Sequence, residues 1–154
     1  MLQITTQKKM PFISVTRLHV RSLRYLPQFA WRTVQIVRQT KRASGLLGGK
    51  LLREARNALW TITAWQDEAS MNAFRIASAH GAVMPKLLGW CDEASVVHWH
   101  QETPELPAWL DAHRRMVNDG RPSKVHHPSP AQLENRIPVP QPGRFELTLK
   151  PAPQ

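Results

Sequence analysis

Cysteine is almost absent from this sequence, since Cys91 is the single one among 154 residues. One thiol cannot form an intramolecular disulfide, so nothing in the sequence indicates an oxidising compartment. Long apolar runs are also absent, and the longest falls far short of the ~20 residues that a membrane-spanning helix needs. The first residues, MLQITTQKKMPF, lack the continuous apolar stretch of a signal peptide. These absences predict a cytoplasmic protein without a membrane span.

Acidic residues are missing from the first third of the chain. Glu54 is the first of them, and residues 1–53 carry eleven Lys or Arg, whereas residues 54–154 hold ten bases and eleven acids. This asymmetry suggests an anionic partner such as nucleic acid, a membrane surface or an acidic ligand. No nucleic-acid-binding motif accompanies the charge, so a solvated basic helix face is the favoured interpretation and a polyanion the alternative. A Walker loop and a dinucleotide-binding glycine pattern are absent as well.

Apolar periodicity predicts strands and helices in alternation. Patterns rich in β-branched and aromatic residues predict strands at 12–20, 46–54, 58–65 and 95–101. Apolar spacings of three and four predict helices at 23–42, ended by Ser44-Gly45, at 67–84 with Asp67 as N-cap, and at 105–120, closed by Gly120. Because Pro85 lacks an N–H and clashes with the preceding turn, we expect a kink or a restart there.

The predicted order is β-α-β-β-α-β followed by one more helix, which is the ferredoxin-like arrangement of an α+β fold. Residues 1–120 are expected to form this domain. Residues 121–154 form a Pro-rich C-terminal extension, since eight of the thirteen prolines lie at 122–154. We expect this tail to contain no helix and to supply one edge strand at 144–150. It either wraps over the domain or its partner or is partly disordered.

A homodimer is predicted from the same topology. Both helices of a β-α-β-β-α-β unit lie on one side of the sheet, which leaves the other face bare. Six tryptophans in so short a chain add much apolar surface. A bare apolar sheet face is best buried against a second copy, as in a dimeric α/β barrel.

The stretch from Ala58 to Trp99, ALWTITAWQDEASMNAFRIASAHGAVMPKLLGWCDEASVVHW, resembles the antibiotic-biosynthesis-monooxygenase-like superfamily of dimeric α/β barrels. With the later GRPSKVHHPSP, it is similar to an uncharacterised bacterial family that resembles spheroidene-monooxygenase-related domains. The resemblance covers roughly residues 12–130. It implies a monooxygenase, a haem-binding protein or a ligand binder, because members of the superfamily include all three.

Four residues are candidates for a site. His80 and Met84 share a helix face, and with Trp65 and Phe74 they could line a pocket between the second helix and the sheet. The neutral imidazole of His80 would be a general base or a haem ligand, and the other three would be walls. The alternative is a partly buried histidine that is hydrogen-bonded to the backbone.

Two other groups carry weaker signals. His98 and His100 form a His-x-His pair on one strand face, a known arrangement for holding a metal, but two ligands do not close a site. Cys91 has no readable His and acid partners and is expected to behave as a small apolar residue.

Three functions therefore stay open. The first is a monooxygenase-like enzyme that acts on an apolar or aromatic substrate, either with haem or without a cofactor. The second is a non-enzymatic ligand-binding or structural dimer. The third is a protein that associates with nucleic acid or another anion through the basic first third.

Overall fold

One antiparallel sheet of six strands organises the computed structural model, which describes residues 10–141 and 145–153. The strand order across the sheet is β5-β4-β1-β3-β2-β6. The central strands are β1 (Phe12–Val20), β3 (Ala58–Trp65), β2 (Leu46–Arg53) and β4 (Cys91–His100). The edges are the two-residue β5 (Arg121–Pro122) and β6 (Phe145–Leu149).

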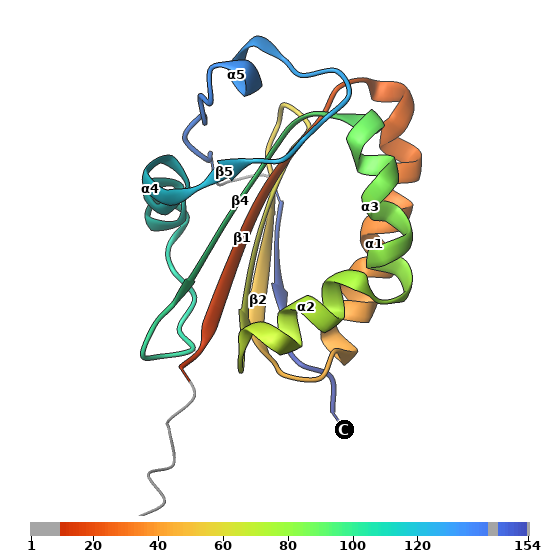
Figure 1. The fold of residues 1–154 in the computed structure, drawn as a ribbon. Coiled ribbons are helices and arrows are strands. Elements are labelled where there is room, and N and C mark those ends of the chain that lie inside the picture. The colour runs from red at the N-terminus through yellow and green to blue at the C-terminus, as the bar shows by residue number, and fades with distance from the viewer. Residues whose placement is uncertain (1–9, 142–144, 154) are drawn as a thin grey trace, which may run out of the picture.

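Helices cover both faces of this sheet (Figure 1). On one side lie α1 (Leu26–Arg42), which follows the short 3-10 helix η1 (Leu23–Tyr25), and α2 (Glu68–Ile76) and α3 (Ser78–Trp90). On the other side lies α4 (Trp109–Asp119). The prediction of an α+β, ferredoxin-like fold is confirmed. In the described part of the chain, no helix is long and apolar enough to cross a bilayer.

The two faces of the sheet differ in chemistry, because side chains alternate along each strand. We call them the cavity face, under α1 to α3, and the α4 face. On β1 the α4 face carries Ile13 and Val15, which are fully buried, whereas the cavity face carries Ser14 and Thr16. Trp60 on the neighbouring β3 is fully buried on the α4 face. The main apolar core therefore lies between the sheet and α4.

This core corrects the expectation of a bare sheet face. Trp109, Ala112 and Met116 of α4 are buried against the α4 face, and Ile137 from the C-terminal tail packs beside them. A single chain thus covers the surface that the sequence argument assigned to a second copy. The β-α-β-β-α-β topology specifies two helices on one face of the sheet. It leaves open where an additional amphipathic helix packs, and α4 packs on the opposite face.

The second helix breaks earlier than expected. The restart lies at Ala77, whose φ is −89° and ψ is 150°, and not at Pro85, which lies inside α3. The side chain of Gln39 in α1 stabilises this break. Its Nε2 donates to the carbonyls of Phe74 (3.3 Å) and Ala77 (2.9 Å), and its Oε1 accepts from the backbone N–H of His80 (2.8 Å). One amide thus satisfies backbone groups on both sides of the interruption.

Most other element boundaries agree with the sequence. Asp67 caps α2 by accepting from the Ser70 N–H at 2.8 Å, and Gly45 ends the α1–β2 connection with φ of +88°. Gly120 is the C-cap of α4, as expected. However, β4 starts four residues before the expected 95, and α4 starts at 109 rather than 105. Pro107 explains the late start, since it holds the residue before it in an extended conformation.

The tail packs back onto the domain instead of leaving it. Gln132 donates to the Ala94 and Ser123 carbonyls and accepts from the Ala94 N–H, which ties the tail to β4. The expectation that the tail holds no helix is wrong for α5 (Pro130–Leu133), where Ser129 caps the Gln132 N–H and Pro130 occupies a helix-start position. The predicted edge strand is present as β6, and residue 144 lies outside the described residues.

Candidate ligand cavity

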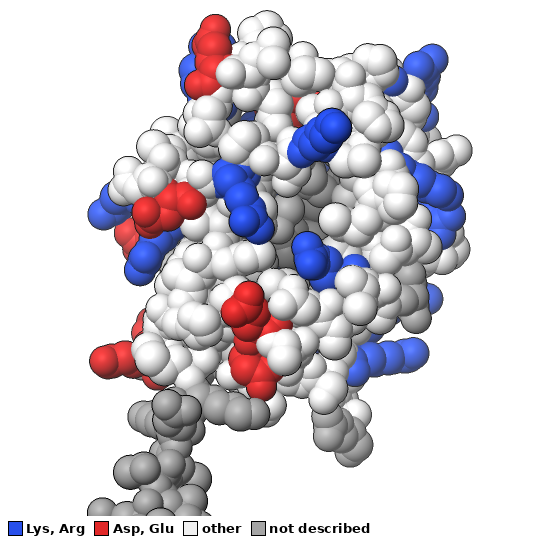
Figure 2. All heavy atoms as spheres, viewed as in Figure 1, with Lys and Arg blue, Asp and Glu red and all other residues white. Residues whose placement is uncertain are grey.

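A cavity of about 340 Å³ lies between the cavity face of the sheet and helices α1, α2 and α3. Figure 2, viewed as in Figure 1, shows a hollow near the middle of the molecule. Lys and Arg side chains border this hollow, and acidic side chains lie at its lower end. Most of the wall is apolar and comes from the helices, including Phe29, Ile36, Val83 and Leu87. A volume of this size falls at the lower end of small-molecule sites, about 300–1,000 Å³.

Hydroxyl groups form the floor of the cavity. Ser14 and Thr16 of β1 pair across the strands with Thr63 and Thr61 of β3, and all four line the cavity. Thr63 accepts a hydrogen bond from the Trp65 indole N–H at 2.8 Å. The other three hydroxyls have no hydrogen-bond partner among the described residues, and their oxygens are not sealed from the cavity. Hydroxyls placed in this way can orient the oxygen atoms of a ligand.

His80, the third residue of α3, lies on the wall of this cavity. Its Nδ1 is 2.8 Å from the Arg75 carbonyl oxygen. Because a carbonyl only accepts, Nδ1 carries the proton and the lone pair of the neutral ring is on Nε2. Within the described part of the chain, Nε2 has no hydrogen-bond partner. The structure therefore leaves one basic nitrogen of His80 available.

The surroundings of His80 keep its imidazole neutral. Burial lowers the pKa of His80 from its ordinary value and the charge of Arg75 acts in the same direction, whereas the hydrogen bond to the Arg75 carbonyl opposes them. The net result is a lowered pKa. At pH 7 the ring is then a base with a free lone pair rather than a cation.

The four residues singled out in the sequence come together here. Trp65, Phe74 and His80 form a row of rings, with centroids 5.1 Å apart for the first pair and 4.9 Å for the second. Met84 lines the same cavity from α3 and is 39% exposed. His80 lies just after the break at Ala77, and Pro85 lies further along the same helix.

His98 and His100 do not gain a third ligand. Both flank the ring of Phe12, at centroid distances of 5.3 and 4.9 Å, and His98 lines the cavity. Burial, followed by the charges of Arg121 and Arg75, lowers the pKa of His98. In the described ranges, no cluster of three metal-ligating side chains includes either histidine.

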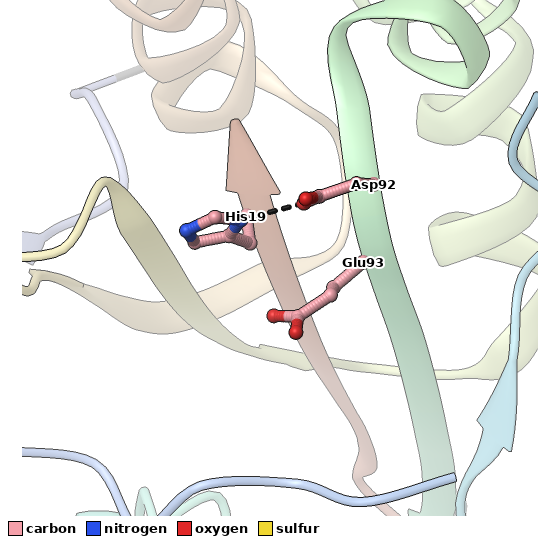
Figure 3. Close-up of side chains that lie close together, drawn as sticks. All are labelled: His19, Asp92 and Glu93. Atoms are coloured by element: carbon pink, nitrogen blue, oxygen red, sulfur yellow. Dashed lines mark hydrogen bonds and ion pairs between the residues drawn. The ribbon is translucent and has the colours of Figure 1, made fainter. Parts of the chain in front are cut away.

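A different cluster, on the α4 face, was not anticipated from the sequence (Figure 3). His19 Nδ1 lies 2.5 Å from Asp92 Oδ1, and Glu93 lies beside them. Arg17 donates to one oxygen of Glu93 (2.9 Å), and the Ser129 hydroxyl donates to the other (2.9 Å). With both oxygens engaged and a guanidinium in contact, the Glu93 carboxylate is a poor cation ligand. This cluster instead joins β1, β4 and the tail.

The surroundings of Cys91 indicate a structural role. Cys91 is fully buried, and burial together with the Asp92 charge raises its pKa to about 12, which matches an inert apolar residue.

The basic residues of the first third do not share one surface. Arg38 and Arg42 are exposed on α1, whereas Arg17 is buried on the α4 face and Arg32 lines the cavity.

No protein-family model and no curated protein matches this chain. Several solved structures are similar to this chain. SnoaB, a cofactor-independent oxygenase from Streptomyces nogalater, has 17% identity and a TM-score of 0.51, covering 64% of this chain and 98% of SnoaB. A conserved protein from Methanosarcina mazei Go1 has 16% identity and a TM-score of 0.53, covering 62% and 96%. A protein described as an antibiotic biosynthesis monooxygenase has 12% identity and a TM-score of 0.52, covering 57% and 95%.

The chain therefore shares the fold of these solved structures, two of which are described as an oxygenase and as an antibiotic biosynthesis monooxygenase. These similarities concern the fold, and function depends on the site that the fold carries.

Proposed function

We propose that this protein binds a small apolar or aromatic molecule in the cavity and acts on it as a monooxygenase-like enzyme. The observation that carries the proposal is His80, a neutral imidazole with an unpartnered Nε2 on the wall of a cavity that is otherwise apolar or hydroxyl-lined. A mostly apolar pocket with a few directing polar groups is typical of small-molecule sites.

In this proposal His80 acts as a general base. Nε2 would take a proton from an acidic C–H or phenolic O–H of the ligand, and the Arg75 carbonyl would hold the resulting imidazolium through Nδ1–H. The floor hydroxyls would orient the ligand's oxygen atoms. A substrate whose CH₂ group becomes C=O supplies the four electrons that O₂ requires, with one oxygen atom entering the product and the other leaving as water. Such a reaction balances without an external reductant.

A test of the site uses N-phenyl-1-naphthylamine, a neutral aromatic probe whose fluorescence rises in apolar surroundings. We expect the wild type to bind it and His80→Ala to bind it several-fold more weakly. The free energy of unfolding should fall by only about 1 kcal/mol or less, because His80 is partly exposed and makes one side-chain hydrogen bond. Fluorescence titration and urea denaturation measure the two quantities.

Two variants serve as controls. Thr61→Trp fills the floor of the cavity and should abolish probe binding, whereas Arg56→Gln, in the exposed β2–β3 turn, should leave it unchanged. Binding that survives Thr61→Trp would place the probe elsewhere and contradict the site. Tight binding of an aromatic ligand with no oxygen uptake would support a ligand-binding protein instead of an enzyme.

Haem is the cofactor alternative, and the absorption spectrum of the purified protein distinguishes it. The lone pair on Nε2 that suits a base also suits an axial iron ligand. A Soret band that disappears in His80→Ala would assign His80 this second role.

We also propose that the protein forms a homodimer, although α4 covers the sheet face. Exposed apolar side chains remain on α1 (Trp31, Val34) and on the outer side of α4 (Leu110, Val117), and such surfaces often mark interfaces. Analytical ultracentrifugation at micromolar concentration should give about twice 17.6 kDa. A single species at the monomer mass would contradict this proposal.

A further inference from the structure

The charged residues that line the cavity are all of one sign. They are Arg32, Arg75 and Arg121, and the described lining contains no Asp or Glu. A mainly apolar cavity concentrates the field of such charges because its walls have a low dielectric constant. This distribution disfavours a cationic ligand and favours an anionic one.

Two of the arginines approach the cavity from opposite layers of the fold. Arg75 is the penultimate residue of α2 in the helix layer, and Arg121 begins the edge strand β5. The charges of both lower the pKa of His98 on β4, and the opposing influence of the Glu68 charge is weaker. Within the described residues, neither guanidinium has a hydrogen-bond or ion-pair partner. Both guanidinium groups therefore line the cavity without a carboxylate of the described residues paired to them.

We propose that the ligand of this cavity is an amphipathic anion. Its carboxylate or comparable acidic group is held between Arg75 and Arg121, and its apolar body lies against Phe74 and Met84. Guanidinium groups suit this role because their planar donors match an oxyanion. The inference rests on the proposed function and narrows its substrate class.

The test compares two probes that share the same rings. 8-Anilinonaphthalene-1-sulfonate differs from N-phenyl-1-naphthylamine by one sulfonate group. The wild type should bind the anion about tenfold more tightly than the neutral probe at low salt, since charge-assisted hydrogen bonds are roughly twice as strong as neutral ones. Decanoate should displace either probe at lower concentration than decanol does.

The double variant Arg75→Gln/Arg121→Gln should remove this preference. Anion affinity should fall about tenfold or more, while the affinity for the neutral probe stays within about twofold. Arg56→Gln is the matched control, because it removes an exposed positive charge outside the cavity. Urea denaturation of each variant checks that the fold is retained.

The outcomes separate this inference from the function on which it rests. If the neutral probe binds but the anion gains nothing, or if the double variant loses no more anion affinity than Arg56→Gln, the anionic substrate class is wrong and the cavity still binds ligands. If neither probe binds wild type, the proposed function fails and this inference fails with it.

Discussion

Replacing Trp60 by alanine is expected to lower the free energy of unfolding by about 4 kcal/mol, within the range for large aromatic truncations in a core. Trp60 is fully buried on the α4 face, among Val15, Ile62 and Met116. Its indole N–H also donates to Glu54 at 3.1 Å, and this bond is lost as well. Neighbouring side chains cannot collapse fully into so large a space, so a cavity penalty adds to the lost burial.

Urea denaturation and thermal melting measure this effect. A loss of about 4 kcal/mol lowers the melting temperature by roughly 8–16 °C in a chain of this length. Leu133→Ala is the control, because Leu133 is 75% exposed on α5, and it should change stability by less than about 0.5 kcal/mol. A Trp60→Ala loss no larger than that of Leu133→Ala would show that the α4 face is not the main core.

Glu93→Gln is expected to cost about 3 kcal/mol at pH 7, the low end for breaking a buried ion pair. The side chains of Arg17 and Glu93 are 5% and 12% exposed and lie 2.9 Å apart. Removing the carboxylate leaves the guanidinium buried without a counter-charge. The bond that Glu93 accepts from Ser129 is weakened too, which loosens the tail from β4.

The effect of Glu93→Gln depends on pH in a defined direction. Burial raises the pKa of Glu93, but the hydrogen bond and charge of Arg17, aided by Ser129 and His19, outweigh burial and lower it overall. A carboxyl whose pKa is lower in the folded state contributes stability above its unfolded pKa, about 4.3, and loses it as pH falls through the folded value. The difference between wild type and Glu93→Gln should therefore shrink below about pH 4.

Two controls accompany this prediction, each followed by urea denaturation across pH. Asp111→Asn breaks an exposed pair with Arg114 and should cost less than about 1 kcal/mol. The double variant Arg17→Met/Glu93→Met removes both charges, and it should be more stable than Glu93→Gln because apolar pairs often replace buried ion pairs without loss. A double variant less stable than Glu93→Gln would show that the charges themselves stabilise the fold.

The cavity lies outside the main core, but its hydroxyl-lined floor depends on that core. The apolar side of the sheet is buried by α4, so the opposite side can keep hydroxyls and an unfilled volume under α1 to α3. The larger of the two buried apolar clusters and the cavity therefore lie on different faces of the sheet. Trp60→Ala should reduce stability without changing the lining of the cavity, whereas Thr61→Trp, one residue along the same strand, should block it.

The local elements were readable from the sequence because their signals are local. Alternating residues in Phe12–Val20 and Ala58–Trp65 specify strands with two different faces. Asp67 and Gly120 mark helix ends through contacts within one turn. Trp65, Phe74, His80 and Met84 were grouped by helical spacing and by resemblance, and all four line one cavity.

Contacts between distant segments were decided only by the tertiary structure. Gln39 reaches 41 residues along the chain to His80, and this contact belongs to a helix break that no local pattern indicates. The sequence also carried no signal that α4 would cover the sheet, or that Arg121 and Arg75 would line the same cavity. Periodicity reports which side of an element is apolar, whereas the partner of that side depends on how the whole chain closes around a shared core.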